Sequence, residues 1–312
     1  MSMSTKSAPP LISTHDLAAR LGVTQGSSTV PASLPANLKL FDCSWLKLPV
    51  FGGRDAYKEF VAQRIPGAMF VDIDEVADQS SPYPHMLPSP MEFSEHTSRL
   101  GVQSGDYVVC YDSIGIFSAP RLWWMFHFFG LPNVSVLDGG LKKWLSDGYP
   151  TDDSPPAPLP SPAPPLPIST QAHMLRSYED INANIDNYNK GMTSGVEQML
   201  DARPLNRFEG KEPEPRPNLP SGHMPHSKSL FFGDLVTPEG PYKDKQALMD
   251  AFNITNVDLD KPIVCSCGSG VSAAIIALAL ELVGKREGVA VYDGSWTEWK
   301  MRQMDEEKAA TK

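Results

Sequence analysis

Two stretches of the chain repeat the same order of apolar and polar positions. Short apolar runs at Val108–Asp112 and Ile263–Cys267 are each followed by an apolar segment of helical length, Ser118–Gly130 and Val271–Gly284, that ends at a glycine. A second short apolar run follows in each case. Short strands that alternate with crossover helices are typical of a mostly parallel sheet covered by helices on both faces. The pattern therefore predicts an α/β fold for each stretch.

Four short blocks occur in the same order in both halves of the chain. YVVCYD aligns with PIVCSC, and LDGGLKKW with YDGSWTEW, each at a distance of 155 residues. Upstream of these, LFDCSW aligns with MLDARP, and RIPGA with HMPHS, each at a distance of 159 residues. Matched blocks in a fixed order indicate an internal duplication. We predict two tandem units of the same α/β fold.

A proline-rich segment separates the two halves. Eight of the thirteen residues from Pro155 to Pro167 are proline, and such a sequence favours an extended, semi-rigid conformation. We therefore predict an N-terminal domain over residues 1–151, a linker over residues 152–167 and a C-terminal domain over residues 168–312.

Composition and charge exclude several classes of protein. The chain has 312 residues, of which 41% are hydrophobic, so it can bury two cores. Its net charge of −10 argues against direct binding of nucleic acid or of an anionic membrane surface. Small anions would have to be bound by individual arginines. No apolar run reaches the roughly 18 residues of a membrane helix, so we expect no membrane partner.

The cysteines indicate the compartment. The chain has four, Cys43, Cys110, Cys265 and Cys267, and they are too few and too unevenly spaced for a secreted disulfide framework. A reducing compartment is therefore expected. We predict a cytoplasmic location, and the acid-poor, serine-rich start of the chain leaves a mitochondrial location open as well.

The duplication separates the two neighbouring cysteines by role. Cys265 aligns with Cys110 inside a matching apolar strand, which is typical of a small buried hydrophobic side chain. Cys267 aligns with Asp112 and lies where the strand ends. Ligands of parallel sheets bind at the carboxyl ends of the strands. Cys267 is therefore the candidate nucleophile.

The residues that follow Cys267 favour an anionic sulfur. In the sequence CGSGVS, Gly268 and Gly270 relax the backbone limits, so that successive N–H groups can curl around one point. A helix N-terminus comes next, and it also attracts negative charge. Such surroundings lower the pKa of a thiol.

Other kinds of cysteine site fit the loop less well. A Cys-x-Cys pair supplies two metal ligands, and no second cluster at zinc spacing follows it. A redox disulfide normally uses Cys-x-x-Cys. A cysteine phosphatase needs an arginine six residues after its cysteine, where this chain has Ala273. Since no G-x-G-x-x-G or phosphate-binding loop occurs either, we expect neither a metal nor a cofactor.

These residues resemble the two-domain rhodanese-like sulfurtransferases. CGSGVSA is similar to the active-site loop of the 3-mercaptopyruvate sulfurtransferases, whereas rhodaneses that use thiosulfate carry charged residues after the cysteine. The resemblance spans nearly the whole chain, through FDCSW, IPGAMFVDIDEVADQSSPYPHMLP, YDSIGIFSAPRLWWMF, LDGGLKKW, DARPLNRFEGKEPEPR, SGHMP and YDGSWTEW. The segments CSCGSGVS and EPEPRPNLPSGHMP are most similar to fungal members linked to tRNA thiouridine formation.

The resemblance implies roles for individual residues. Cys267 would take sulfur as a persulfide and pass it to a small thiol, to cyanide or to a protein that activates a sulfur carrier. Ser269 would join His85 and Asp74 in a relay that moves protons during the transfer. The first domain lacks a cysteine at the position of Asp112, so it would be silent in cysteine chemistry and would lend His85 and Asp74 to the site across a cleft between the domains.

Two arginines match the substrate-binding pair of the family. Arg207 and Arg216 would bind the carboxylate of the donor, because a guanidinium offers a bidentate fork to a planar carboxylate. The alternative is that one of them pairs with a nearby glutamate, Glu209, Glu212 or Glu214.

The loop also bears on the identity of the donor. Gly268, Gly270, Val271 and Ser272 would contact it, and their neutral side chains favour 3-mercaptopyruvate over the thiosulfate dianion. A thiosulfate sulfurtransferase and a relay that passes sulfur chiefly between proteins stay as alternatives. A rhodanese-fold binding module without catalysis is disfavoured, since such modules usually lose the cysteine that this chain keeps.

Overall fold

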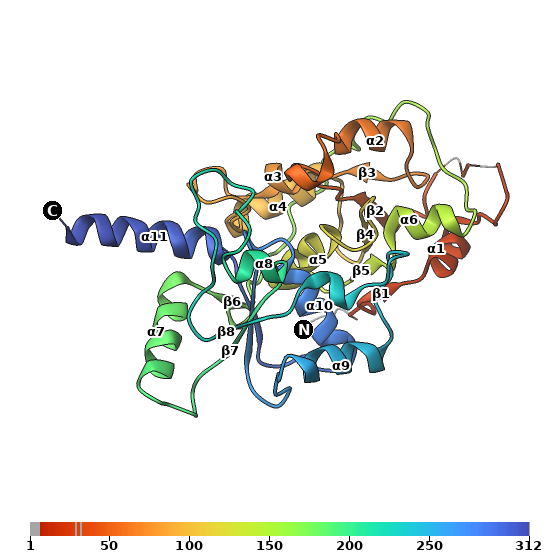
Figure 1. Cartoon of the computed structure of the whole chain (residues 1–312). Coiled ribbons are helices and arrows are strands. Elements are labelled where there is room, and N and C mark those ends of the chain that lie inside the picture. The colour runs from red at the N-terminus through yellow and green to blue at the C-terminus, as the bar shows by residue number, and fades with distance from the viewer. Residues whose placement is uncertain (1–6, 29, 32, 312) are drawn as a thin grey trace, which may run out of the picture. The chain divides into compact units, whose positions relative to one another are not determined.

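The described residues form two compact units. The computed structural model describes residues 7–28, 30–31 and 33–311 (Figure 1). Unit 1 consists of the chain up to Gln79, of Pro88–Gln171 and of Val236–Tyr242. Unit 2 consists of Ser80–Leu87, of Ala172–Leu235 and of the chain from Lys243 onward. Each unit thus includes a short segment from the half of the sequence that builds the other.

Unit 1 is built on a five-stranded parallel sheet in the order β1-β5-β4-β2-β3. Its strands are β1 (Leu11–Ile12), β2 (Leu38–Asp42), β3 (Met69–Phe70), β4 (Tyr107–Tyr111) and β5 (Val134–Leu137). Its helices are α1 (Thr14–Leu21), α2 (Ala56–Ala62), α3 (Ile73–Val76), α4 (Pro90–Arg99), α5 (Ala119–Phe128) and α6 (Gly140–Ser146), with a 3₁₀ turn at Pro49–Phe51.

Unit 2 has a second five-stranded parallel sheet, in the order β6-β10-β9-β7-β8. Its strands are β6 (Leu175–Arg176), β7 (Gln198–Asp201), β8 (Ser227–Ser229), β9 (Ile263–Ser266) and β10 (Val289–Tyr292). Its helices are α7 (Tyr178–Asn189), α8 (Leu205–Phe208), α9 (Lys245–Ile254), α10 (Ala273–Val283) and α11 (Ser295–Ala310), with 3₁₀ turns at Ala172–Met174 and Phe232–Leu235.

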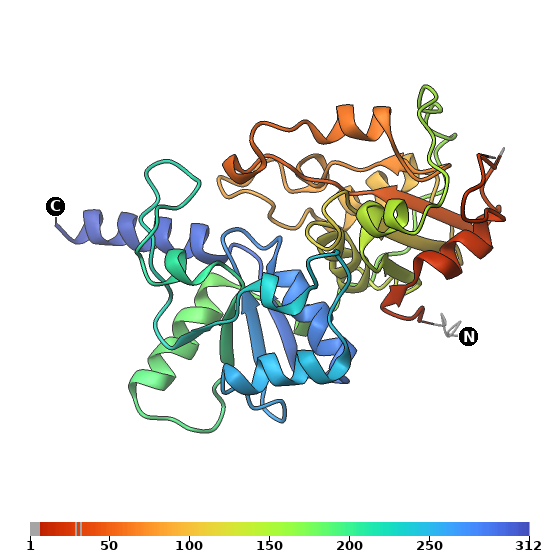
Figure 2. The ribbon, with the colours of Figure 1, turned by 45° about the vertical axis from the view of Figure 1, so that its right-hand side comes forward.

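The two sheets have the same strand order, strand for strand along the chain. The apolar runs predicted as strands are β4 and β9, which occupy the centre of their sheets, and the long apolar segments after them contain α5 and α10. In Figure 2 the strands of unit 2 lie side by side, and α10 packs against β9 and β10 with α9 beside it. The prediction of an α/β fold in each half is confirmed.

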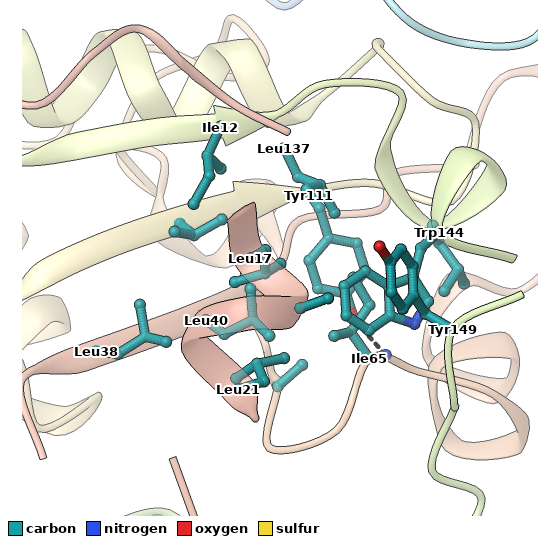
Figure 3. Packing of buried hydrophobic residues seen from close by; sticks show 14 of the residues in the cluster. Ile12, Leu17, Leu21, Leu38, Leu40, Ile65, Tyr111, Leu137, Trp144 and Tyr149 are labelled. Atoms are coloured by element: carbon teal, nitrogen blue, oxygen red, sulfur yellow. Dashed lines mark hydrogen bonds between the residues drawn. The ribbon is translucent and has the colours of Figure 1, made fainter. Parts of the chain in front are cut away.

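Alternating strand positions and helix faces fill the core of unit 1. Leu40 of β2, Tyr111 of β4 and Leu137 of β5 are fully buried in one cluster with Trp144 of α6 (Figure 3). The polar atoms of Tyr111 and Trp144 take part in hydrogen bonds. The Tyr111 hydroxyl accepts a hydrogen bond from the backbone N–H of Ile65, and Trp144 Nε1 donates to a carbonyl. Buried aromatic groups of this kind combine a large apolar area with a single polar contact.

The proline-rich segment is attached to α4 of unit 1. The Ser94 hydroxyl donates to the carbonyl of Leu166 at 2.9 Å, and the Ser98 hydroxyl donates to the carbonyl of Ala163. Ala163 returns a backbone hydrogen bond to Ser98. Ala163 and Leu166 are themselves buried, so this part of the segment has a fixed path.

Among the described residues, the helices are too short or too polar to cross a membrane.

Asp42 makes unit 1 sensitive to pH. It ends β2, is 1% exposed, and accepts hydrogen bonds from the backbone and hydroxyl of Ser44. Burial raises the pKa of Asp42 from 3.8 to about 6, although the bonds from Ser44 lower it in part. The folded chain thus holds this proton more tightly than the unfolded chain. The stability that Asp42 contributes is highest below about pH 4 and falls by up to about 3 kcal/mol as the pH rises to about 6.

We predict that Asp42→Asn removes this loss of stability with rising pH, because the amide keeps an acceptor for Ser44 and does not titrate. The free energy of unfolding should be measured with urea between pH 4 and pH 8. The exposed Asp153→Asn serves as the control and should leave the pH dependence of the wild type unchanged. Equal slopes for the wild type and Asp42→Asn in this range would contradict the prediction.

Candidate active site

Cys267 lies at the carboxyl end of β9, at the start of the loop that leads into α10. It is 2% exposed. The carbonyls at the start of this loop are held by the beginning of α11, since Trp296 N donates to the carbonyl of Cys267 and Thr297 N to that of Gly268, both at 3.0 Å. Gly270 has a φ of +80°, which a glycine adopts without strain. The predicted strand, turn and helix around Cys267 are therefore present.

The side chain of Ser295 holds this loop through hydrogen bonds. Its hydroxyl oxygen accepts the backbone N–H groups of Cys267 at 3.0 Å and Gly270 at 3.1 Å, while the hydroxyl donates to the carbonyl of Tyr292. Ser295 is fully buried and has a φ of +52°, which costs energy in a residue other than glycine. The sequence reasoning missed this residue. The signal that could have revealed it is a difference between the repeats, because the second repeat has this serine where the first repeat has Gly140.

The matching loop of unit 1 holds a negative charge of its own. Asp112, the counterpart of Cys267, is fully buried. Its two carboxylate oxygens accept five backbone N–H groups at 2.8–3.0 Å, from Ile114, Gly115, Phe117, Ser118 and Ala119. A loop of this shape is therefore a cradle for an anion at its first residue. In unit 1 the cradle is filled by the side chain of the chain itself.

His85 lies in unit 2, although its sequence position is in the first half. Its Nδ1 is 2.9 Å from the hydroxyl oxygen of Ser269, and both side chains are 5% exposed. Arg216 Nη2 donates to the same oxygen at 3.0 Å. Because a guanidinium can only donate, the Ser269 proton is left for His85 whenever Nδ1 carries none. The structure thus brings together three of the predicted residues, His85, Ser269 and Arg216. Of these, Ser269 lies two positions after Cys267 in the sequence.

The two predicted arginines approach the residue next to Cys267. A Cβ placed on Gly268 would lie 3.4 Å from Arg207 Nη2 and 3.8 Å from Arg216 Nη1. A side chain at position 268 would therefore occupy the space in front of both guanidiniums. The glycine leaves this space unfilled.

A buried ion network fixes Arg207. Arg203, which is 2% exposed, donates to both oxygens of Asp201 and to one oxygen of Glu214. The other oxygen of Glu214 accepts from Arg207 Nη2 at 2.5 Å. Burial lowers the pKa of Arg203, but the two carboxylates outweigh it and hold that pKa above its ordinary value. The pairing with a nearby glutamate thus occurs at Arg207, whereas Arg216 reaches Ser269.

The remaining predicted residues lie in less central places. Asp74 belongs to unit 1, where it accepts hydrogen bonds from Trp45 Nε1 at 2.9 Å and from Lys47 Nζ at 2.5 Å. Its part in a relay with His85 stays a prediction. Val271 is buried in the loop, and Ser272 precedes the first residue of α10.

Cys265 has the surroundings of a structural side chain. It is fully buried in β9, as its counterpart Cys110 is in β4. Burial, together with the neighbouring Cys267, raises the pKa of the Cys265 thiol far above its ordinary value. Within residues 7–28, 30–31 and 33–311, no group of three or more histidine, cysteine, aspartate or glutamate side chains is arranged to hold a metal ion.

The chain is similar to known proteins over most of its length. The model of the Rhodanese-like domain matches it at residues 38–147 and again at residues 184–302. Human 3-mercaptopyruvate sulfurtransferase is 43% identical over 272 residues, which cover 86% of this chain and 87% of that protein. Thiosulfate sulfurtransferase of Cricetulus griseus is 40% identical over 270 residues, or 86% of both chains.

A solved structure extends the similarity to the fold. The sub-stoichiometric sulfur transferase subunit of yeast mitochondrial complex I is 38% identical, with a TM-score of 0.80, over 94% of this chain and 97% of that one. One domain match falls in each half of the sequence, which agrees with the repeated sheet order. The predicted duplication and the two-domain fold are confirmed.

We predict that iodoacetate alkylates Cys267 in the native protein before any other cysteine. The guanidiniums near Gly268 attract the carboxylate of the reagent, whereas Cys43, Cys110 and Cys265 are fully buried. Mass spectrometry of the digested protein measures the labelled sites.

Neutral iodoacetamide is the control for this prediction. Arg216→Ala should slow the reaction with iodoacetate severalfold more than the reaction with iodoacetamide. First labelling at Cys265 would contradict the assignment of Cys267.

Proposed function

The chain belongs to the rhodanese family and is a sulfurtransferase, and from this membership we propose that Cys267 is its nucleophile and carries the transferred sulfur as a persulfide. The observation that carries the proposal is the loop of unit 1, where five backbone N–H groups bind the carboxylate of Asp112. Cys267 has the matching position in unit 2. A loop of the same kind would stabilise a thiolate and the anionic persulfide that replaces it.

The proposed donor is 3-mercaptopyruvate. The Cys267 thiolate attacks the thiol sulfur of the donor, and an S–S bond forms as the S–C bond breaks. The electron pair of the broken bond leaves on carbon as the enolate of pyruvate. The proton of the transferred sulfur passes to that carbon, which gives pyruvate and an anionic persulfide. An acceptor thiolate or cyanide then attacks the outer sulfur and restores the Cys267 thiolate.

Arg216 and Arg207 would bind the donor carboxylate. Both guanidiniums lie near Gly268, the residue that directly follows the proposed nucleophile. Arg207 also shares an ion pair with Glu214, whereas Arg216 donates to Ser269 within the loop that follows Cys267. Gly268, Gly270, Val271 and Ser272 would line the place of the reacting sulfur.

His85 and Ser269 would move the proton. Their side chains are 2.9 Å apart, within the range of a proton transfer. Asp74 would orient the imidazole of His85. Arg216 also donates to the Ser269 hydroxyl, so the group that binds the carboxylate is in contact with the group that passes the proton. Binding of the donor would therefore change the surroundings of Ser269 directly.

Thiosulfate is the second candidate donor, because the chain is also 40% identical to a thiosulfate sulfurtransferase. Near Cys267, Arg203 and Arg207 are paired with Asp201 and Glu214. The side chains of Gly268, Gly270, Val271 and Ser272 in the loop are neutral. Neutral loop side chains favour the monoanion 3-mercaptopyruvate over the thiosulfate dianion.

The acceptors follow from the resemblance to fungal members. We propose a small thiol or cyanide as the acceptor in solution, and a protein that activates a sulfur carrier for tRNA thiouridine formation as the acceptor in the cell. A net charge of −10 supports contact with that protein rather than with the tRNA itself. The cytoplasm is the proposed location, together with the mitochondrion, where the similar yeast subunit is part of complex I.

We predict that Arg216→Ala raises the KM for 3-mercaptopyruvate by about tenfold to a hundredfold, because it removes a charge-assisted hydrogen bond to the carboxylate. Initial rates with 3-mercaptopyruvate and with thiosulfate, with cyanide as the acceptor, measure this effect. Arg216→Lys keeps the charge without the fork and should recover part of the affinity. A wild type that prefers thiosulfate would overturn the choice of donor.

We also predict that Cys267→Ser abolishes transfer and that Cys265→Ser keeps turnover within about twofold, since Cys265 is a buried strand residue. Mass spectrometry of the wild type after exposure to the donor, without an acceptor, should show one added sulfur atom on the peptide that contains Cys267. Transfer that survives Cys267→Ser would disprove the proposed nucleophile.

A further inference from the structure

A buried carboxylate of unit 2 binds the segment that carries His85. The backbone N–H of Leu87 donates to Asp293 Oδ2 at 2.6 Å. Asp293 directly follows β10 and is 2% exposed. Two residues later, the hydroxyl of Ser295 accepts the N–H groups of Cys267 and Gly270. One short turn, Asp293–Ser295, therefore holds both the loop of the histidine and the loop of the nucleophile.

Unit 1 contains the same contact at the matching positions. The backbone N–H of Tyr242 donates to Asp138 Oδ1 at 2.9 Å, and Asp138 directly follows β5. Tyr242 lies 155 residues after Leu87, and Asp293 lies 155 residues after Asp138. The two halves thus exchange the same loop, Ser80–Leu87 for Val236–Tyr242, and an aspartate after the same strand holds each one.

The two exchanged loops differ at the position two residues before the held N–H. Unit 2 has His85 there, with a φ of +64°, and unit 1 has Gly240, with a φ of +117°. A Cβ on Gly240 would lie 3.1 Å from the carbonyl oxygen of Gly139 and 3.3 Å from the Cα of Gly115. The loop in unit 1 therefore packs its backbone against the filled cradle, whereas the loop in unit 2 presents an imidazole to Ser269.

We propose that Asp293 is a positioning residue for His85. A left-handed conformation is strained in a histidine and persists only where the surrounding contacts enforce it. The bond from Leu87 to Asp293 fixes the chain two residues away and so keeps Nδ1 against Ser269. The catalytic part of this inference rests on the proposed function, whereas the anchoring of the loop does not.

Hydrogen exchange tests the anchor without any assay of activity. In the full chain, Asp293→Ala should speed the exchange of amides in residues 80–87 by about tenfold or more, because a charge-assisted bond to the Leu87 amide is lost. The matched control, Asp138→Ala, should do the same to residues 236–242 and leave residues 80–87 unchanged. Unchanged exchange of residues 80–87 in Asp293→Ala would overturn the proposal.

A double-mutant cycle tests the route through His85. Asp293→Ala should lower kcat with 3-mercaptopyruvate by about tenfold and leave KM within about twofold, while Asp138→Ala keeps both near the wild type. In a His85→Gln background, Asp293→Ala should cause no further loss of kcat. An equal further loss in that background would overturn the proposal.

The remaining outcomes separate this inference from the proposed function. If His85→Gln alone leaves kcat unchanged, the proposed proton relay fails, and hydrogen exchange alone decides whether Asp293 anchors the loop. If Asp293→Ala does not fold, Asp293→Asn and Asp138→Asn replace the alanine pair. An amide keeps an acceptor oxygen without the charge, so a loss of about threefold in kcat is expected for Asp293→Asn and none for Asp138→Asn.

Discussion

The structure depends on the loop at the carboxyl end of the central strand of each sheet and on what the backbone N–H groups of that loop bind. After β4 five of them bind the carboxylate of Asp112. After β9 the same position is Cys267, and the N–H groups of Cys267 and Gly270 bind the hydroxyl oxygen of Ser295. The two loops therefore differ in what their N–H groups bind, which is a carboxylate of the loop itself in unit 1 and a serine at the start of α11 in unit 2.

In each unit, the turn after the neighbouring strand, which is β5 in unit 1 and β10 in unit 2, binds segments that surround this loop. In unit 2, Asp293 and Ser295 bind segments that are far apart in the sequence. In unit 1, Asp138 keeps its contact with Tyr242, but Gly140 lies too close to the carbonyl of Asp112 to carry a side chain. The aspartate is thus common to both units, and the serine belongs to the unit with the cysteine.

The sequence alone supports the fold, the duplication and the choice of Cys267, because these depend on local patterns and on the comparison of one half with the other. The contacts of Arg203, Ser295 and Asp293 could not be predicted, since each depends on a partner brought near by the fold. The sequence analysis expected the first domain to lend His85 to the site with Cys267. The structure counts the loop of His85 as part of unit 2 itself, and no local pattern shows this.

The exchange of segments also has a consequence for the synthesis of the chain. Unit 1 includes Val236–Tyr242, so its last contacts can form only after most of the polypeptide has left the ribosome. Domains usually fold one after another during translation, from the N-terminus onward. Here the contacts of Val236–Tyr242 with the rest of unit 1 must wait for the second half of the chain, and contacts across such long stretches of sequence slow folding. Completion of unit 1 therefore comes late in translation, close in time to that of unit 2.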